Sequence, residues 1–464
     1  MNNWEQQRNN LFGLTEGGTI VYRDKSGKVR PNWLCACEQE RNLTVGLMDR
    51  VADPLNLQKA YRRVKANAGK CGVDGMEVKE LGKWMKANFQ TLQDQLLKDC
   101  YTPEPVRGVQ IPKPQGGYRQ LGIPTVKDRL VQQAIHQILS ERYDKIFSEN
   151  SYGFRPQRRA HQALAQAGRY VAKGYEYVID LDLEKFFDEV NHHRLMWLMS
   201  KRIGDARVLT LIHRFLKAGL LQEGLMSQRT KGTPQGGPLS PLLSNIILDE
   251  LDKELERRGH CYVRYADDVK VFVRSEASAE RVKDRISNFI EGNLLLKVNG
   301  KKSRICKGYE LNFLGHSILR NGQLGLSEQS EERVKRKVKQ ITQRRRGVSL
   351  SQILMELRRY LPGWIMYFKH ALMTRKMAEL DRWVRRKLRC YRLKQCKRVI
   401  GIVRMLRNLG VEETLCWRTA LSGKSWWRLS NSPGSNVGMN NRWFNDHGYY
   451  SVYDNYKALH RKLL

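Results

Sequence analysis

Long apolar runs are missing from this 464-residue sequence. No stretch approaches the roughly 18 apolar residues that a membrane-spanning helix needs. The first ten residues, MNNWEQQRNN, lack the basic and then apolar pattern of a secretory signal. The nine cysteines are odd in number and scattered, and none forms a C-x-x-C pair, which disfavours a disulfide scaffold and a zinc site. We therefore expect no membrane partner and a reducing, cytoplasmic location.

Acidic residues are scarce relative to basic ones. The chain has 83 lysines and arginines against 47 aspartates and glutamates, a net charge of +36. Residues 331–410 alone hold 24 basic and 5 acidic residues. A solvated helix surface remains the alternative, but so unbalanced a charge favours a polyanionic partner. The basic residues proposed to contact nucleic acid are Arg333, Lys335, Arg336, Lys337, Lys339, Arg382, Arg385, Arg386 and Arg389.

The spacing of apolar residues predicts alternating helical and extended regions. Helical spacing runs from Leu47 to about Leu97 and again over 126–172, apart from a turn at 151–156. Prolines and glycines between 101 and 125 predict a strand, a turn and a second strand. Beyond residue 330 the pattern is helical to about 408, and after 422 the chain is rich in Gly, Asn, Ser and aromatic residues. That last region suits either nucleic-acid stacking or a small aromatic core.

Two predicted strands carry carboxylates. In the strand Tyr177–Leu183 a period of two places Asp180 and Asp182 on one face. A second strand, Cys261–Tyr265, leads into Ala266-Asp267-Asp268 and then an alternating apolar run, which predicts a hairpin with acids at its tip. Converging carboxylates repel one another unless a cation lies between them. Hard oxygen ligands suit Mg²⁺, and two such ions can promote nucleotidyl transfer.

Further motifs give these acids a family context. The segment 265–268, YADD, resembles the Y-x-D-D signature of reverse transcriptases, and 182–188, DLEKFFD, resembles their first carboxylate motif. Between them 232–241, GTPQGGPLSP, also resembles the family pattern, as does FLGH at 313–316. With IPKP at 111–114, LGIPT at 121–125, SYGFRP at 151–156 and LPGWIMYF at 361–368, the chain resembles a group II intron-encoded reverse transcriptase/maturase over roughly residues 46–430.

The resemblance implies roles for individual residues. Asp182, Asp267 and Asp268 would hold two Mg²⁺ ions, and Asp180 would have a supporting role. Lys302 would protonate the leaving pyrophosphate, although Lys301 beside it could serve instead. The dNTP would be contacted by Lys113, Arg119, Phe187 and Gln235. Phe187 would exclude a 2′-hydroxyl, its alternative being core packing. Tyr265 would either contact the template-primer or pack beneath the hairpin.

The resemblance also implies an α+β right-hand polymerase: fingers, a palm with an antiparallel sheet, a helical thumb and a small basic C-terminal region. We expect an N-terminal extension at 1–45, fingers at 46–145, palm at 146–320, thumb/maturase domain at 321–408 and a nucleic-acid-binding region at 409–464. His447 and His460 lack the metal-ligand companions of a C-terminal endonuclease, which we therefore do not expect.

Three functions stay open at this point. The first is an RNA-directed DNA polymerase that also binds group II intron RNA for splicing and retrohoming. Its partners would be intron RNA, an RNA template, a DNA primer, target DNA and dNTPs, with nucleoid association during DNA integration in a bacterial cytoplasm. The second is a related reverse transcriptase recruited to DNA repair or phage defence. The third is a splicing maturase that does not polymerise, against which the three intact aspartates argue.

Overall fold

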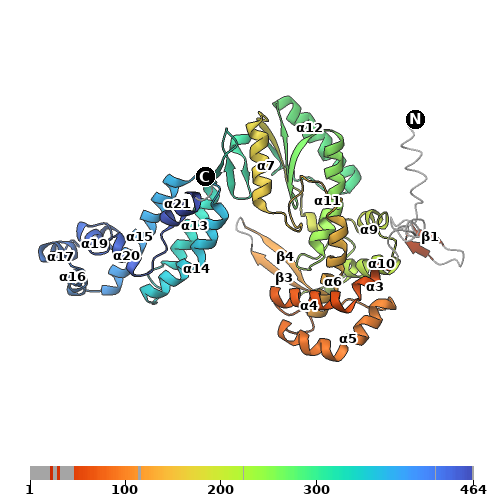
Figure 1. The fold of residues 1–464 in the computed structure, drawn as a ribbon, viewed down its shortest axis with the longest axis horizontal. Coiled ribbons are helices and arrows are strands. Elements are labelled where there is room, and N and C mark those ends of the chain that lie inside the picture. Colours follow the sequence, from red (N-terminus) through yellow and green to blue (C-terminus); the bar gives the residue numbers. More distant parts are fainter. Residues whose placement is uncertain are drawn as a thin grey trace. The chain divides into compact units, whose positions relative to one another are not determined.

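The computed structural model describes residues 21–23, 29–31, 46–112, 116–222, 224–423 and 425–461. The chain divides into two compact units (Figure 1). Unit 1 comprises residues 1–166 and 175–306, and unit 2 comprises residues 167–174 and 307–464. The five-part division expected from the sequence stays a prediction.

Unit 1 begins with a helical layer. After the short hairpin of β1 (Val21–Arg23) and β2 (Val29–Pro31) come α3 (Leu47–Val51), α4 (Pro54–Asn67), the 3₁₀ helix η1 (Val78–Glu80) and α5 (Leu81–Leu97). Asp53 caps α4 by accepting hydrogen bonds from the amides of Leu55 and Asn56, and Pro54 occupies the first helical position, where its missing N–H costs nothing. Helices α3 and α4 pack against α6 (Val126–Tyr143), and α5 packs against α3.

The expected strand-turn-strand at 101–125 is confirmed as β3 (Val106–Pro112) and β4 (Tyr118–Ile123), paired antiparallel. They belong to a four-stranded sheet of order β4-β3-β6-β7, completed by β6 (Leu220–Gln222) and β7 (Leu225–Ser227). The helical pattern over 126–172 is confirmed as α6 and α7 (Ala160–Ala172), interrupted at the predicted turn.

A second sheet, of order β10-β5-β9-β8, forms the centre of unit 1. Its strands are β5 (Tyr177–Leu181), β8 (Cys261–Tyr265), β9 (Asp268–Val273) and β10 (Arg304–Lys307). The expected strand at 177–183 is two residues shorter in the structure. Leu183 instead makes an isolated bridge with Val298, so Asp182 stands just beyond the strand end.

One face of this sheet is covered by helices. Ile179 and Val271 belong to the same buried cluster as Val282 and Ile286 of α12 (Glu276–Phe289), and α11 (Ser240–Arg257) packs beside β8. Alternation along a strand places Asp180 and Lys270 on the other face. The remaining elements of unit 1 are α8 (Phe186–Glu189), α9 (His192–Ser200), α10 (Ala206–Lys217) and the π-helix η2 (Ile290–Leu294).

Unit 2 is mainly helical, as the sequence pattern predicts. It starts with η3 (Gly308–Glu310) and the sheet of β11 (Asn312–Phe313), β12 (His316–Ile318) and β13 (Leu324–Leu326). Then come α13 (Glu328–Ile341), α14 (Leu350–Phe368), α15 (Thr374–Cys396), α16 (Val399–Asn408), α17 (Glu413–Ala420), α18 (Trp426–Leu429), α19 (Pro433–Gly438), α20 (Asn441–Asp446) and α21 (Val452–Arg461). Phe444, Tyr449 and Tyr456 are buried in its core, which favours the aromatic-core alternative for the C-terminal region.

Candidate active site and nucleic-acid face

The tip of the β8–β9 hairpin presents Asp267 and Asp268. Tyr265 pairs with Asp268 across the turn, and Ala266 adopts a left-handed conformation with φ of 59°. A Cβ at Gly153 would collide with the backbone nitrogen of Ala266. Only glycine therefore allows the 151–156 segment to lie this close to the turn.

A buried ion pair between Arg264 and Asp252 supports the tip of the β8–β9 hairpin. Arg264 is fully buried; its Nε lies 2.8 Å from Oδ1 of Asp252, and Nη1 donates to the carbonyl of Ala266 at 3.0 Å. The same nitrogen donates to Asn245, whose amide donates in turn to the carbonyl of Gly153. The strained turn and the glycine segment are thus tied to helix α11 by one hydrogen-bond network.

Asp182 and Asp267 lie within each other's electrostatic influence. Burial raises the pKa of Asp267, the negative charge of Asp182 raises it further, and the positive charge of Arg119 opposes both effects. Asp182 is fixed through its backbone, since its N–H donates to Ser303 Oγ at 3.0 Å and its carbonyl accepts from Asn299 at 2.8 Å. The structure thus brings together three residues far apart in the sequence.

Lys270 was missed by the motif comparison, yet it lies among the carboxylates. This buried lysine in β9 stands opposite Asp180 in β5 and forms ion pairs with both Asp180 and Asp268. Burial raises the pKa of Asp268, and the charge of Lys270 lowers it. Arg304 Nε lies 3.6 Å from the other oxygen of Asp180. The sequence held a usable signal, because Lys270 follows Asp268 by two residues and therefore shares its strand face.

Lys302 lies beside Asp182, with Nζ 3.7 Å from Oδ2, while 63% of its side chain stays exposed. Within the described ranges no carboxylate lies within 4 Å of the Lys301 ammonium. The geometry therefore favours Lys302 of the two candidates.

The 232–241 segment is attached to two neighbours. Thr233 donates its N–H to the carbonyl of Phe187 at 2.6 Å, and Gly122 of β4 donates to the carbonyl of Gln235 at 3.0 Å. A Cβ at Gly236, whose φ is 140°, would lie 2.6 Å from the Gly122 carbonyl oxygen, so this contact also requires glycine. The loop connects the β3–β4 hairpin to the residues that follow Asp182.

Phe187 is half-buried and meets Phe186 edge to face, with ring centroids 5.2 Å apart. It both packs against the core of unit 1 and keeps part of its ring exposed, so the gate and packing alternatives both remain. Arg119 is exposed on β4, opposite Ile111. The predicted dNTP contact Lys113 lies outside the described residues.

The carboxylates fit a divalent cation, with substrate completing the ligand set. Among the described residues no three His, Cys, Asp or Glu side chains already gather as a metal cluster. Mg²⁺ typically takes one or two carboxylates, with phosphate and water oxygens supplying the rest. Burial and the negative charge of Asp182 both raise the pKa of Asp267, and a bound cation would offset both effects. Asp182 and Asp267 fit best, because Asp268 is paired with the buried Lys270, whereas Asp182 faces the largely exposed Lys302 at 3.7 Å.

The two basic helices of unit 2 differ in how they use their charges. In α13, Val334 and Val338 are buried, whereas Arg333, Arg336, Lys337 and Lys339 are exposed. Lys335 is half-exposed and pairs with Glu331 at 2.6 Å. This arrangement leaves four cations of α13 directed to solvent.

In α15 several arginines face the protein. Arg389 is buried and donates to the carbonyls of Ser430 and Met439. Arg385 pairs with buried Asp381, and Arg386 lies over the ring of Trp427. Only Arg382, of the four predicted contacts in α15, is exposed. The burial of Arg389 argues against a direct phosphate contact by that residue.

The antiparallel central sheet, the acidic hairpin and the following helical region together define a right-hand nucleic-acid polymerase. The family model described as reverse transcriptase (RNA-dependent DNA polymerase) matches residues 111–318. The model of the group II intron maturase-specific domain matches residues 331–407. The chain belongs to the reverse transcriptases that carry a group II intron maturase domain, which confirms the family and the fold class expected from the sequence.

Curated relatives agree with this assignment. Protein YkfC of Escherichia coli (strain K12) is 34% identical over 326 residues, covering 62% of this chain and 84% of that protein. The group II intron-encoded protein LtrA of Lactococcus lactis subsp. cremoris is 32% identical over 291 residues, 48% of each chain. The chain thus spans about half the length of LtrA.

In the described part of the chain, no helix combines the length and apolarity needed to cross a bilayer.

Proposed function

We propose that this protein extends a DNA primer on an RNA template, using Asp182, Asp267 and Asp268 around two Mg²⁺ ions. The observation that carries the proposal is the electrostatic proximity of Asp182, just beyond the end of β5, and Asp267, at the tip of the β8–β9 hairpin, with the charge of Arg119 acting on Asp267. Metal ions held there would activate the primer hydroxyl and stabilise the leaving pyrophosphate.

Residues of the chain would do the remaining work. Arg119 would bind the triphosphate, because it is an exposed cation in the field of Asp267. Lys302 would hold a proton near the leaving group, and Gln235 would contact the incoming nucleotide from its glycine-rich loop. Lys270 would fix the positions of Asp180 and Asp268 through its two ion pairs.

We further propose that the bound RNA is a structured group II intron RNA and that splicing and retrohoming into target DNA are the biological setting. The maturase-specific match at residues 331–407 supports this proposal, and it overlaps the basic helices α13 and α15. The exposed cations of α13 suit phosphate contacts, which would make RNA binding strongly salt-dependent.

Replacing Asp267 by Asn tests the catalytic proposal. This change removes one charged ligand while preserving size, so Mg²⁺-dependent extension of a primed RNA template should fall by at least about a thousandfold. RNA affinity should be unchanged within about twofold, because the nucleic acid is held elsewhere. The matched control is Asp94→Asn in α5, which removes a carboxylate that no proposed step uses. Extension by Asp267→Asn near the control level would contradict the two-metal assignment.

A further inference from the structure

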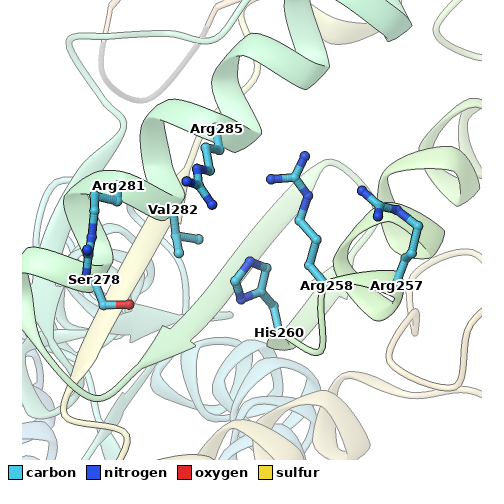
Figure 2. A pocket seen from close by; sticks show the side chains of 7 residues that line it. All are labelled: Arg257, Arg258, His260, Ser278, Arg281, Val282 and Arg285. Carbon is cyan, nitrogen blue, oxygen red and sulfur yellow. The ribbon is translucent and has the colours of Figure 1, made fainter.

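A basic cavity lies between two helices of unit 1, with a volume of about 600 Å³ (Figure 2). It is lined by Arg257, Arg258, His260, Ser278, Arg281, Val282 and Arg285. Arg257 ends α11 and Arg258 follows it, His260 precedes β8, and the others come from α12. None of these residues belongs to the motifs that define the polymerase.

The cavity is separated from the catalytic carboxylates by the central sheet. Val282 in its lining belongs to the buried cluster that covers the Ile179 and Val271 face of the sheet. Asp180 and Lys270 lie on the opposite face of the same strands. A ligand in the cavity would therefore lie across the sheet from Asp180 and Lys270.

The residues that line the cavity carry more positive charge than nearby carboxylates neutralise. Glu254 accepts from both Arg257 and Arg258, at 2.8 and 2.6 Å from their Nε atoms. Within the described ranges, neither Arg281 nor Arg285 has a carboxylate within 4 Å. Figure 2 shows Arg258 and Arg285 on facing sides of the gap, with His260 between them. Four guanidinium groups therefore surround one opening, and among the described residues the carboxylate of Glu254 is the one negative charge that pairs with them. An anionic ligand could balance the remaining positive charge.

The guanidinium group matches the geometry of phosphate, with two parallel N–H donors for two oxygens. The types of residue in the lining also indicate which kind of phosphate ligand fits. Small-molecule pockets are lined mainly by apolar and aromatic side chains, whereas Val282 is the one apolar side chain among the seven that line this cavity. None of the seven is Phe, Tyr or Trp, the usual side chains on which a base stacks, and the small imidazole of His260 is the one ring. The site therefore suits a sugar-phosphate backbone rather than a nucleotide held by its base.

We propose that this cavity binds the sugar-phosphate backbone of structured RNA, as a second RNA contact on the helical side of the palm. The proposal rests on the proposed function only in taking RNA as the partner. Ser278 and His260 place a hydroxyl and an imidazole beside the arginines, and these groups can hydrogen-bond a 2′-hydroxyl. Burial, together with the charges of Arg258 and Arg285, lowers the pKa of His260, so at neutral pH its ring can both donate and accept.

The test compares two double variants with equal charge change. Arg258→Gln with Arg285→Gln removes two facing guanidinium groups of the cavity. Lys253→Gln with Lys283→Gln removes two cations from the same helices, outside the cavity lining. Affinity for a structured RNA is measured at several salt concentrations, beside primer extension on a short unstructured RNA template.

We expect the arginine variant to bind the structured RNA at least about tenfold more weakly at low salt, with a salt slope lower by about one to two. The lysine variant should bind like the unaltered protein, and extension on the short template should be equal in all three. Equal RNA affinity of the two variants would overturn the proposal. Circular dichroism spectra and melting temperatures are compared first, and a misfolded arginine variant is replaced by Arg258→Lys with Arg285→Lys, which keeps the charge but loses bidentate bonding.

Two further measurements exclude other ligands. An equal loss of affinity for an RNA duplex and for a DNA duplex of the same sequence would overturn the assignment to RNA. Stabilisation by inorganic pyrophosphate that the arginine variant loses, with RNA affinity unchanged, would indicate a site for a small anion instead. The proposed polymerase function is judged separately, by extension with the unaltered protein, so failure of the cavity and failure of the function give different results.

Discussion

Units 1 and 2 each bury an aspartate that pairs with an arginine, but the two ion pairs stabilise different parts of the chain. In unit 1 the pair of Asp252 and Arg264 lies directly under the hairpin that carries Asp267. In unit 2 Asp381 pairs with Arg385 and accepts hydrogen bonds from Tyr449 and from the amide of Val452, far along the chain. The first pair positions a site, whereas the second connects α15 to the C-terminal segment.

The comparison shows that a count of charges does not locate a binding surface. The helices α13 and α15 both read as basic runs, yet α13 directs most of its cations to solvent and α15 uses Arg385, Arg386 and Arg389 within unit 2. Long charged side chains serve packing as readily as binding, because an arginine can satisfy several carbonyl groups at once. Burial and partners decide which role a given arginine has.

The largest effect should come from breaking the pair beneath the hairpin. Arg264→Met leaves Asp252 buried without its partner and should lower the free energy of unfolding of unit 1 by about 3–5 kcal/mol. Urea titration followed by hydrogen exchange of the β8 and β9 amides measures this change. The double variant Arg264→Met with Asp252→Leu should recover part of the loss, since no unpaired charge remains. A single variant as stable as the unaltered protein would refute the role given to this pair.

Arg389→Met tests whether α15 uses its arginines for packing. Losing the donors to Ser430 and Met439 should cost unit 2 about 1–3 kcal/mol, because two buried carbonyls lose a partner. The salt dependence of RNA binding should stay the same. Arg382→Met, an exposed arginine of the same helix, is the control and should change stability by less than about 0.5 kcal/mol. If Arg389→Met instead lowered the slope of log K against log salt without a loss of stability, Arg389 would be a nucleic-acid contact.

Neutralising α13 tests the opposite behaviour. Replacing Arg333, Arg336 and Lys337 by Gln should lower the slope of log K against log salt by about two to three, with little change in stability. Lys335 is left in place because it pairs with Glu331. The control replaces Lys83, Lys86 and Lys98, which are exposed on or beside α5. If both triple variants gave the same slope, α13 would be an ordinary solvated face.

Phe187 in unit 1 has two proposed roles, packing in the core and contact with the incoming nucleotide. Phe187→Ala should raise ribonucleotide incorporation relative to deoxynucleotides by about tenfold, because the clash with the 2′-hydroxyl is removed. The ratio of incorporation efficiencies for dNTP and rNTP measures this effect. Phe186→Ala is the control, since this buried neighbour should lower stability without changing the ratio. An unchanged ratio for Phe187→Ala would make that residue a packing residue alone.

Much of the protein follows from its sequence. The alternation around Asp180 predicts a strand and the sequence around Ala266 predicts a hairpin with acids at its tip, and the spacing from residue 330 to about 408 predicts the helices of that part of unit 2. These features depend on local periodicity and on the conformational preferences of single residues, which neighbours in the sequence determine. The order of the motifs was enough to predict the family.

Only the tertiary structure decided which charges act together. The sequence places Lys270 on the strand face of Asp268, but its contact with Asp180 exists because β5 and β9 pair in one register. Arg389 and Arg333 are alike in a charge count, but one is buried against carbonyls and the other faces solvent. The cavity around Arg258 and Arg285 likewise brings together the C-terminal end of α11 and one side of α12. Charge interactions depend on distance and burial, and both are set by chain segments that the local sequence does not specify.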